Sequence, residues 1–183
     1  IKGLKELQKA LNIILQCVYT PHGAATGFVL GKSIVDNASM HTNQNYVYNI
    51  DLKDFFPSIE KSRVWGRLMI APFNLNTTNE RKKIANMIAV LCCTPMNVER
   101  LVDGIWNKDN IISVLPQGAP TSPTVTNAIC EKLDIRLSGV AKRFGLNYSR
   151  FSGTSGSQYN VNLTPSPALN TNTWYMAAVT YDG

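Results

Sequence analysis

Long apolar runs, paired cysteines and a signal peptide are missing from this sequence of 183 residues. No stretch approaches the roughly 20 apolar residues that a membrane helix needs, so we expect a cytoplasmic protein with no membrane partner. The four cysteines form no CxxC pair and have no histidine at zinc-ligand spacing, which favours buried free thiols over a zinc site. Because the chain begins with Ile1 and not with Met, further residues are expected upstream.

Charged residues are missing from the last part of the chain. All 18 Lys and Arg and 11 of the 12 Asp and Glu precede residue 151, after which Asp182 alone carries a charge. The net charge of +6 therefore originates in residues 1–150. A basic domain suggests a nucleic-acid partner, because neutralised phosphates release their counterions. A basic protein with a solvated surface explains the same charge equally well.

The compositional break predicts two parts. With 44% hydrophobic residues in the chain, residues 1–150 can bury a core and form one globular domain. Residues 151–183 are rich in Ser, Thr, Asn, Gly and Pro, which indicates a linker or irregular tail. The one strand candidate in this tail is residues 174–181, which would form a β fragment.

Within the first part, the spacing of apolar residues predicts an α+β fold. Helices are expected where apolar residues recur at three- and four-residue steps. These segments are residues 4–18, 34–38, 61–69, 81–93 and 122–144. The last helix should begin with Ser122 as cap and Pro123 in the first turn, and should stop at Gly145. Strands are expected at residues 46–52 and 146–151.

Asp51 ends the predicted strand 46–52, and Asp54 follows three residues later. Carboxylates at the point where a strand meets a loop can bind Mg²⁺. A structural explanation is also open, in which Asp54 caps the next helix and Asp51 is an ordinary strand-end carboxylate.

Residues 115–123, Leu-Pro-Gln-Gly-Ala-Pro-Thr-Ser-Pro, form a loop that enters the last helix. Gly118 permits close approach of a ligand to the backbone, and the prolines stiffen the loop that presents Gln117. By itself the loop could be a rigid helix entry. Its position downstream of Asp51 makes the two segments together a more specific signal of function than the loop alone.

The sequence around these residues resembles retron-type bacterial reverse transcriptases. Residues 49–59, Asn-Ile-Asp-Leu-Lys-Asp-Phe-Phe-Pro-Ser-Ile, and the Gln117-Gly118 loop are similar to two palm motifs of that family. Residues 27–34, Gly-Phe-Val-Leu-Gly-Lys-Ser-Ile, are similar to its fingers motif and stand in the expected order. Group II intron enzymes are a more distant resemblance. The resemblance implies the fingers and a partial palm of a right-hand polymerase, with an antiparallel sheet and packed helices.

The resemblance also implies roles for residues in the first palm motif. Asp51 would be the catalytic carboxylate that binds both Mg²⁺ ions, and the backbone carbonyl of Leu52 would be a further ligand. Phe56 would lie under the incoming sugar as a steric gate that prefers deoxynucleotides. The alternative for Phe56 is an ordinary core aromatic.

In the other two motifs, Gln117 and Gly118 would line the nucleotide pocket, and Lys32 would approach the triphosphate or the template backbone. The implied partners are an RNA template, a DNA primer and deoxynucleoside triphosphates, with a structured noncoding RNA as a further candidate. The implied reaction is DNA synthesis on RNA by two-metal phosphoryl transfer. A retron RNA, an intron and a phage-defence system are all possible settings.

The sequence departs from the family after Phe151. In the family, the segment matching residues 148–151 continues into Ala-Asp-Asp, which supplies the remaining metal-binding carboxylates. Here Ser152-Gly153-Thr154 follows instead, and the thumb is expected to be missing as well. We therefore expect negligible polymerase activity, because one carboxylate cannot hold two metals.

The tail has a resemblance of its own. Residues 172–183, Asn-Thr-Trp-Tyr-Met-Ala-Ala-Val-Thr-Tyr-Asp-Gly, are similar to a strand and turn of laminin-G-like or concanavalin-like jelly-roll domains. One strand cannot form a two-sheet sandwich, so a truncated or joined reading frame is the favoured explanation. Two other functions stay open. The chain could be a catalytically dead nucleic-acid-binding module, or a carbohydrate-binding protein that acts through its tail.

Overall fold

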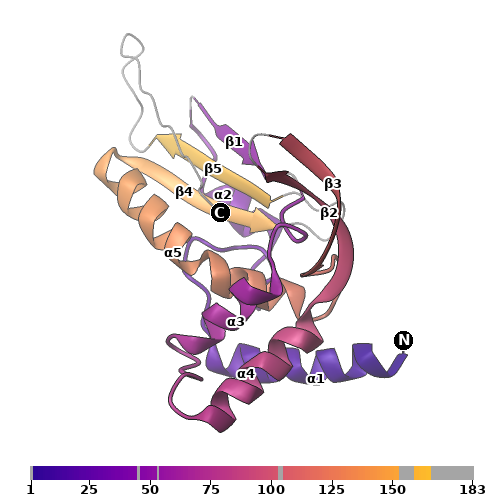
Figure 1. The fold of residues 1–183 in the computed structure, drawn as a ribbon. Coiled ribbons are helices and arrows are strands. Elements are labelled where there is room, and N and C mark those ends of the chain that lie inside the picture. Colours follow the sequence, from indigo (N-terminus) through magenta and orange to yellow (C-terminus); the bar gives the residue numbers. More distant parts are fainter. Residues whose placement is uncertain (1, 45, 53, 103–104, 153–158, 166–183) are drawn as a thin grey trace.

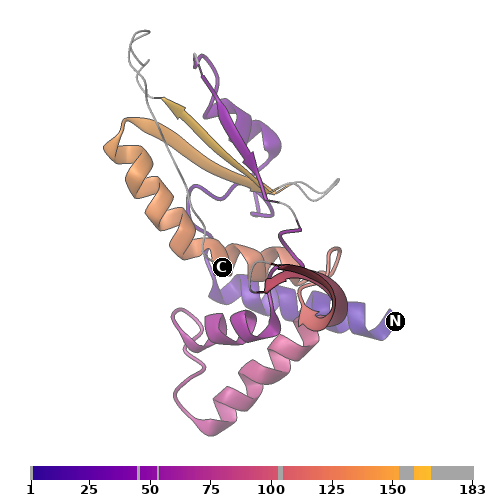
Figure 2. The same cartoon turned by 45° about the horizontal axis from the view of Figure 1, so that its top comes forward.

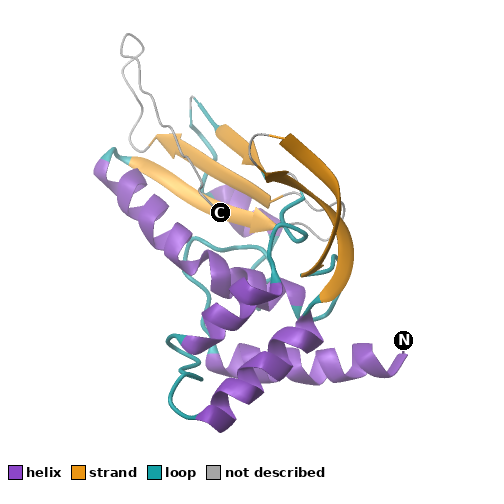
Figure 3. Cartoon of the chain, viewed as in Figure 1, coloured by secondary structure: helices purple, strands orange, loops and turns teal. Residues whose placement is uncertain are grey.

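The computed structural model describes residues 2–44, 46–52, 54–102, 105–152 and 159–165. Within these ranges, helices pack beside a small antiparallel sheet and a separate β-ribbon, so the predicted α+β class is confirmed (Figure 1). Figure 3 shows most helices on one side of the molecule and the strands on the other.

The helices follow the predicted apolar spacing closely. They are α1 Lys2–Val18, α2 Ile34–Ser39, α3 Lys61–Met69, α4 Asn79–Cys92 and α5 Ser122–Arg143. The start of α5 differs in detail from the prediction, because Thr121 holds the cap position and Ser122 lies in the first turn. The Ser122 hydroxyl donates instead to the Pro116 carbonyl at 2.7 Å. Asp54 is not the cap of α3, since that position belongs to Glu60.

The main sheet has the strand order β1-β5-β4, with antiparallel neighbours. Its strands are β1 Tyr48–Asp51, β4 Leu146–Ser152 and β5 Tyr159–Pro165. Strands β2 Thr94–Val102 and β3 Ile105–Val114 pair with each other as a long ribbon with a register shift near Val98. Sequence analysis predicted β1 and β4 but missed this ribbon.

Strand β5 corrects the expected linker. Residues 159–165 form the strand between β1 and β4, although the Ser- and Thr-rich composition predicted irregular chain there. The physical reason is an alternation of Tyr159, Val161 and Leu163 with polar residues, which is the two-residue period of a strand. The strand candidate 174–181 lies outside the described residues.

Two apolar clusters hold these elements together. The larger one joins α1, α3, α4 and the first turns of α5 through Leu15, Val64, Ala89 and Val125. The smaller one joins α5 to the sheet through Leu137, Ala141 and Tyr148. Figure 2 shows the result, with α5 running from the helical cluster to the sheet and lying along β4. The helix that follows the Gln117 loop therefore connects both parts of the fold.

The predicted free thiols are found, although not all are buried. Cys92 and Cys130 are buried, Cys93 is half-buried and Cys17 is exposed, and none forms a disulfide. Burial raises the pKa of Cys130 to about 11 and that of Cys93 to about 12, so both stay protonated at neutral pH. None of the described helices is long and apolar enough to cross a membrane.

Candidate functional site

Asp51 lies at the end of β1, at one edge of the main sheet. Its backbone pairs with Asn160 of β5, and Asn160 pairs on its other side with Phe151 of β4. Strands β1 and β4 are therefore parallel to each other, and Asp51, Asn160 and Phe151 form one row across the sheet, one residue before β4 ends at Ser152. Two strand spacings, about 10 Å, separate their backbones. The side chain of Asp51 lies outside what the structure describes.

By the resemblance, this row is where the palm carboxylates are expected, and two metal ions there would need more than one of them. Residues 152–158, Ser-Gly-Thr-Ser-Gly-Ser-Gln, contain no carboxylate. Among the side chains that are described, no group of three or more His, Cys, Asp or Glu could hold a metal. Asp54, the nearest acidic residue in sequence, is exposed.

Leu52 and Phe56 lie close to Asp51 in the chain but point their side chains into the core. Leu52 packs partly buried against the larger apolar cluster. Phe56 is 6% exposed and meets the Phe55 ring edge-on, with the ring centroids 6.2 Å apart. Phe56 is thus a core aromatic in this structure, and its role as a steric gate stays a prediction.

The Gln117-Gly118 loop is exposed and firmly anchored. The Leu115 amide donates to the Ile59 carbonyl at 2.9 Å, which ties the loop to the segment after Asp51. Gly118 has φ of 81°, a left-handed conformation that favours glycine. A Cβ at Gly118 would meet nothing within 4 Å, so backbone conformation and not crowding requires the glycine. The anchored loop presents Gln117 to solvent, and its place in a nucleotide pocket stays a prediction.

Lys32 is exposed in the fingers motif and folds back on its own loop. Its ammonium donates to the Gly23 carbonyl at 3.1 Å. The neighbouring Ser33 and Asp36 form a capping box at the start of α2. Hydrogen bonds from Ser33 lower the pKa of the Asp36 carboxyl. The structure does not bring Lys32 to the row of Asp51 through any described contact, so its nucleotide role stays a prediction.

A buried ionic network joins the predicted motifs, and sequence analysis missed it. Arg150 of β4 is 1% exposed, and Asp134 of α5 is fully buried. The Arg150 guanidinium donates two hydrogen bonds of 2.8 Å to the Asp134 carboxylate and one of 3.1 Å to the Asn127 side chain. The Tyr148 hydroxyl donates to the same carboxylate at 2.7 Å. Hydrogen bonds therefore satisfy both buried charges, as buried ions require.

The same network reaches the fingers motif through backbone bonds. The Arg150 amide donates to the Ala24 carbonyl at 2.8 Å, and the Thr26 amide donates to the Arg150 carbonyl at 2.9 Å. The side-chain amide of Asn127 donates to the Gly27 carbonyl at 3.1 Å. Arg150 thus fixes three segments relative to one another: the end of β4, helix α5 after the Gln117 loop, and the start of the fingers motif.

A signal for this network was present in the sequence. Asp134 falls on the stripe of α5 that also carries Cys130, Leu137 and Ala141, which is the face expected to be buried. A charged residue on such a face needs a partner of opposite charge. What the sequence does not give is the strand position of Arg150, because that depends on the packing of β4 against α5.

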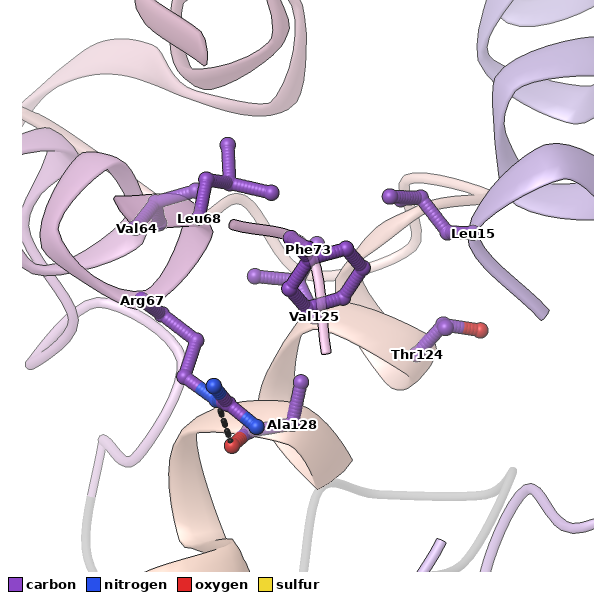
Figure 4. Close-up of a pocket in the computed structure, with 8 residues that line it drawn as sticks. All are labelled: Leu15, Val64, Arg67, Leu68, Phe73, Thr124, Val125 and Ala128. Atoms are coloured by element: carbon purple, nitrogen blue, oxygen red, sulfur yellow. Dashed lines mark hydrogen bonds between the residues drawn. The ribbon is translucent and has the colours of Figure 1, made fainter. Parts of the chain in front are cut away.

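Two hollows lie near these elements. The first, between α1, α3 and α5, is apolar apart from Thr124 and Arg67, and the Arg67 guanidinium points to the Ala128 carbonyl at 2.6 Å (Figure 4). Its volume of about 10 Å³ is too small for a nucleotide. The second is an open groove of about 1110 Å³ between the loop after β1, the start of α3 and the β2–β3 ribbon. Asp54, Arg63, Arg100 and Trp106 are among its lining residues, so the groove adjoins the first palm motif.

Comparison with known proteins agrees with the motifs. No protein-family profile matches the chain. It is 38% identical over 152 residues to Retron Mx162 reverse transcriptase of Myxococcus xanthus, which covers 80% of the chain and 29% of that protein. It is 35% identical over 126 residues to Retron Ec86 reverse transcriptase of Escherichia coli, which covers 69% of the chain and 32% of that protein.

A third relative also matches most of the chain and a minor part of its own length. Retron Mx65 reverse transcriptase of Myxococcus xanthus is 35% identical over 152 residues, covering 82% of the chain and 34% of that protein. The chain thus spans about a third of the length of these curated relatives. By these matches the chain belongs with the retron-type bacterial reverse transcriptases, as a part of such a protein.

Proposed function

We propose that residues 1–150 are the fingers and partial palm of an RNA-directed DNA polymerase, and that residues 151–183 are a tail foreign to that fold except where β5 joins the sheet. The observation that supports this most directly is the row of Asp51, Asn160 and Phe151. It brings Asp51 of the first palm motif into one row with Phe151, after which the family continues into Ala-Asp-Asp. Two motifs that are far apart in sequence thus reach the same end of one sheet, on the two sides of β5.

In this proposal the loops of the predicted motifs bind the substrates. Gln117 and Gly118 contact the incoming deoxynucleotide from an anchored, exposed loop. Lys32 approaches its triphosphate or the template after leaving the Gly23 carbonyl. Phe56 limits the space under the sugar. The partners are an RNA template, a DNA primer and deoxynucleoside triphosphates, and the free thiols suit the reducing cytoplasm.

The proposal includes a limit on catalysis. Mg²⁺ is the cofactor that the family implies, with Asp51 and the Leu52 carbonyl as ligands. Two ions about 3.5 to 4 Å apart need more than one carboxylate between them. Residues 152–158 contribute none, so we propose that this chain does not extend a primer as it stands.

Primer extension on poly(rA)/oligo(dT) with Mg²⁺ tests this directly. The variants are the chain itself, a restored chain with Ser152→Ala, Gly153→Asp and Thr154→Asp, and the restored chain with Asp51→Ala. A matched control carries Gly153→Asn and Thr154→Asn, which keeps the size of the new side chains but removes their charge. We expect incorporation from the restored chain alone. Incorporation by the original chain would contradict the limit, and silence from all variants would favour the next alternative.

The strongest alternative is a nucleic-acid-binding module without catalysis. The basic charge of residues 1–150 favours it. Salt-dependent binding of the primer-template, with no incorporation even by the restored chain, would select it. A carbohydrate-binding function would need the tail, so binding on a glycan array that disappears when residues 166–183 are deleted would select that function instead.

A further inference from the structure

Helix α5 separates its charges by sign. Its two acidic residues face inward, where Glu131 pairs with Arg67 and Asp134 pairs with Arg150. All the other charged residues of the helix are basic and exposed: Lys132, Arg136, Lys142 and Arg143. The outer face of the second half of α5 is therefore uniformly positive.

The basic residues also share one direction. At 3.6 residues per turn, Lys132, Arg136 and Arg143 lie within about 40° of one another around the helix, and they span about 16 Å along it. The buried residues Leu137 and Ala141 lie on the opposite side, against the sheet. In Figures 1 and 2 the second half of α5 runs along β4, and no other described helix or strand covers its outer side.

The ordinary explanations account for only part of this face. Cations in the last turn offset the negative end of the helix dipole, which explains Lys142 and Arg143. The dipole effect fades within one turn, so it does not explain Lys132 and Arg136. Exposed charge also keeps a protein in solution, but Ile135 and Phe144 are 56% and 61% exposed on the same half of the helix. Basic and apolar residues together are typical of a surface that binds a polyanion.

We infer that the outer face of α5 binds the phosphate backbone of a nucleic-acid duplex. This inference rests on the proposed function for the choice of nucleic acid over an anionic lipid surface. A stripe of about 16 Å matches about five phosphates along one strand at 3.4 Å each. Because the sheet with Asp51 lies on the other side of α5, the duplex bound here is separate from the primer-template at the candidate site. A structured RNA that stays attached to the protein fits this surface.

Fluorescence anisotropy with a labelled RNA hairpin, titrated at several salt concentrations, measures the contribution of this face. One variant combines Lys132→Ala, Arg136→Ala, Lys142→Ala and Arg143→Ala. The charge-matched control combines Lys5→Ala, Arg81→Ala, Lys82→Ala and Lys83→Ala, which are exposed on α1 and α4. A third variant exchanges Lys and Arg at the four positions of α5 and keeps every charge. Circular dichroism verifies that each variant is folded.

We expect the α5 variant to bind the hairpin at least tenfold more weakly, and its salt slope to fall by about 3, since each lost phosphate contact removes about 0.9. The control should keep most of the affinity, and the exchanged variant should bind normally. Equal losses in the α5 variant and the control would overturn the inference, because net charge alone would then explain binding. Unchanged affinity in the α5 variant would overturn it as well.

Two further experiments distinguish this inference from binding to lipid and from the proposed polymerase function. Vesicles of phosphatidylserine and phosphatidylcholine test the lipid alternative. Loss of vesicle binding with intact hairpin binding would make α5 a lipid surface and reject the inference. If the restored chain fails to extend primers while hairpin binding still requires α5, the proposed polymerase function fails and the α5 surface stands.

Discussion

Arg150 and Asp51 lie near the same end of one sheet, in adjacent rows, yet their surroundings differ. Arg150 is buried, and a carboxylate, an amide oxygen and two backbone partners satisfy its polar groups. Asp51 lies at the end of β1, in the same row as Phe151. Residues 152–158, which follow Phe151 in the sequence, contain no second carboxylate. The comparison teaches that the framework of a palm and its chemistry are separable. The framework depends on buried contacts of residues 1–150 and on β5, which lies between β1 and β4, whereas in the proposed function the chemistry depends on Asp51 and on the few residues after Phe151.

The largest expected effect comes from breaking the buried pair. Asp134→Ala leaves the Arg150 guanidinium buried without its carboxylate, which should lower the free energy of unfolding by about 3 to 5 kcal/mol. Urea denaturation followed by circular dichroism measures this. Replacing both partners, with Asp134→Leu and Arg150→Met, should cost much less because no charge is left unpaired.

Arg136→Ala is the matched control for this experiment, since Arg136 is exposed on the same helix. Its effect should stay within about 0.5 kcal/mol. If Asp134→Ala were as mild as Arg136→Ala, the network would not hold the motifs together, and the contrast between the surroundings of Arg150 and Asp51 would lose its physical basis.

The next largest effect tests whether β5 joins β1, which ends at Asp51, to β4, which carries Arg150. Val161 pairs with Ile50 of β1 and Arg150 of β4, so it occupies a central strand. Val161→Pro removes an amide donor from that strand and should destabilise the chain by about 3 kcal/mol. Val161→Thr keeps both the amide and the β-branched shape, and should cost far less. Equal melting temperatures for the two variants would show that the sheet does not need β5.

These two experiments concern the features that sequence analysis missed. The helices could be predicted because their apolar stripes are local patterns. Strand β1 and the exposed Gln117 loop could be predicted for the same reason, with the family motifs as support. The position of β5 could not, because its composition resembles a linker and its partners are more than a hundred residues away in the case of β1. The Arg150–Asp134 pair is also a product of packing between a helix and a strand.

A smaller effect tests whether the left-handed backbone of Gly118, and not steric contact, requires glycine in the Gln117 loop. Gly118→Ala forces a side chain into a left-handed backbone and should cost about 1 kcal/mol. Gly139→Ala is the matched control, because Gly139 lies inside α5 and a methyl group added there would meet nothing within 4 Å. It should stabilise the chain by about 0.5 to 1 kcal/mol. Thermal melts of both variants give the signs, and a stabilising Gly118→Ala would mean that the loop does not hold this conformation in solution.

The smallest effect is a dependence of stability on pH near the end of β4. His41 is 9% exposed, and its Nε2 atom lies 2.7 Å from the Ser149 hydroxyl, beside Arg150 in the chain. Burial lowers the pKa of His41 below its ordinary value of 6.5. The unfolded chain therefore takes up the proton first as the pH falls, so the stability that His41 contributes is present above pH 6.5 and is lost as the pH falls through the lowered pKa. His41→Gln removes the titrating group, and urea midpoints measured from about pH 7 to about pH 5 should then change less with pH than those of the unaltered chain. Identical pH profiles for the two chains would mean that His41 is not desolvated, and that the buried region around Arg150 is more open to water than its hydrogen bonds indicate.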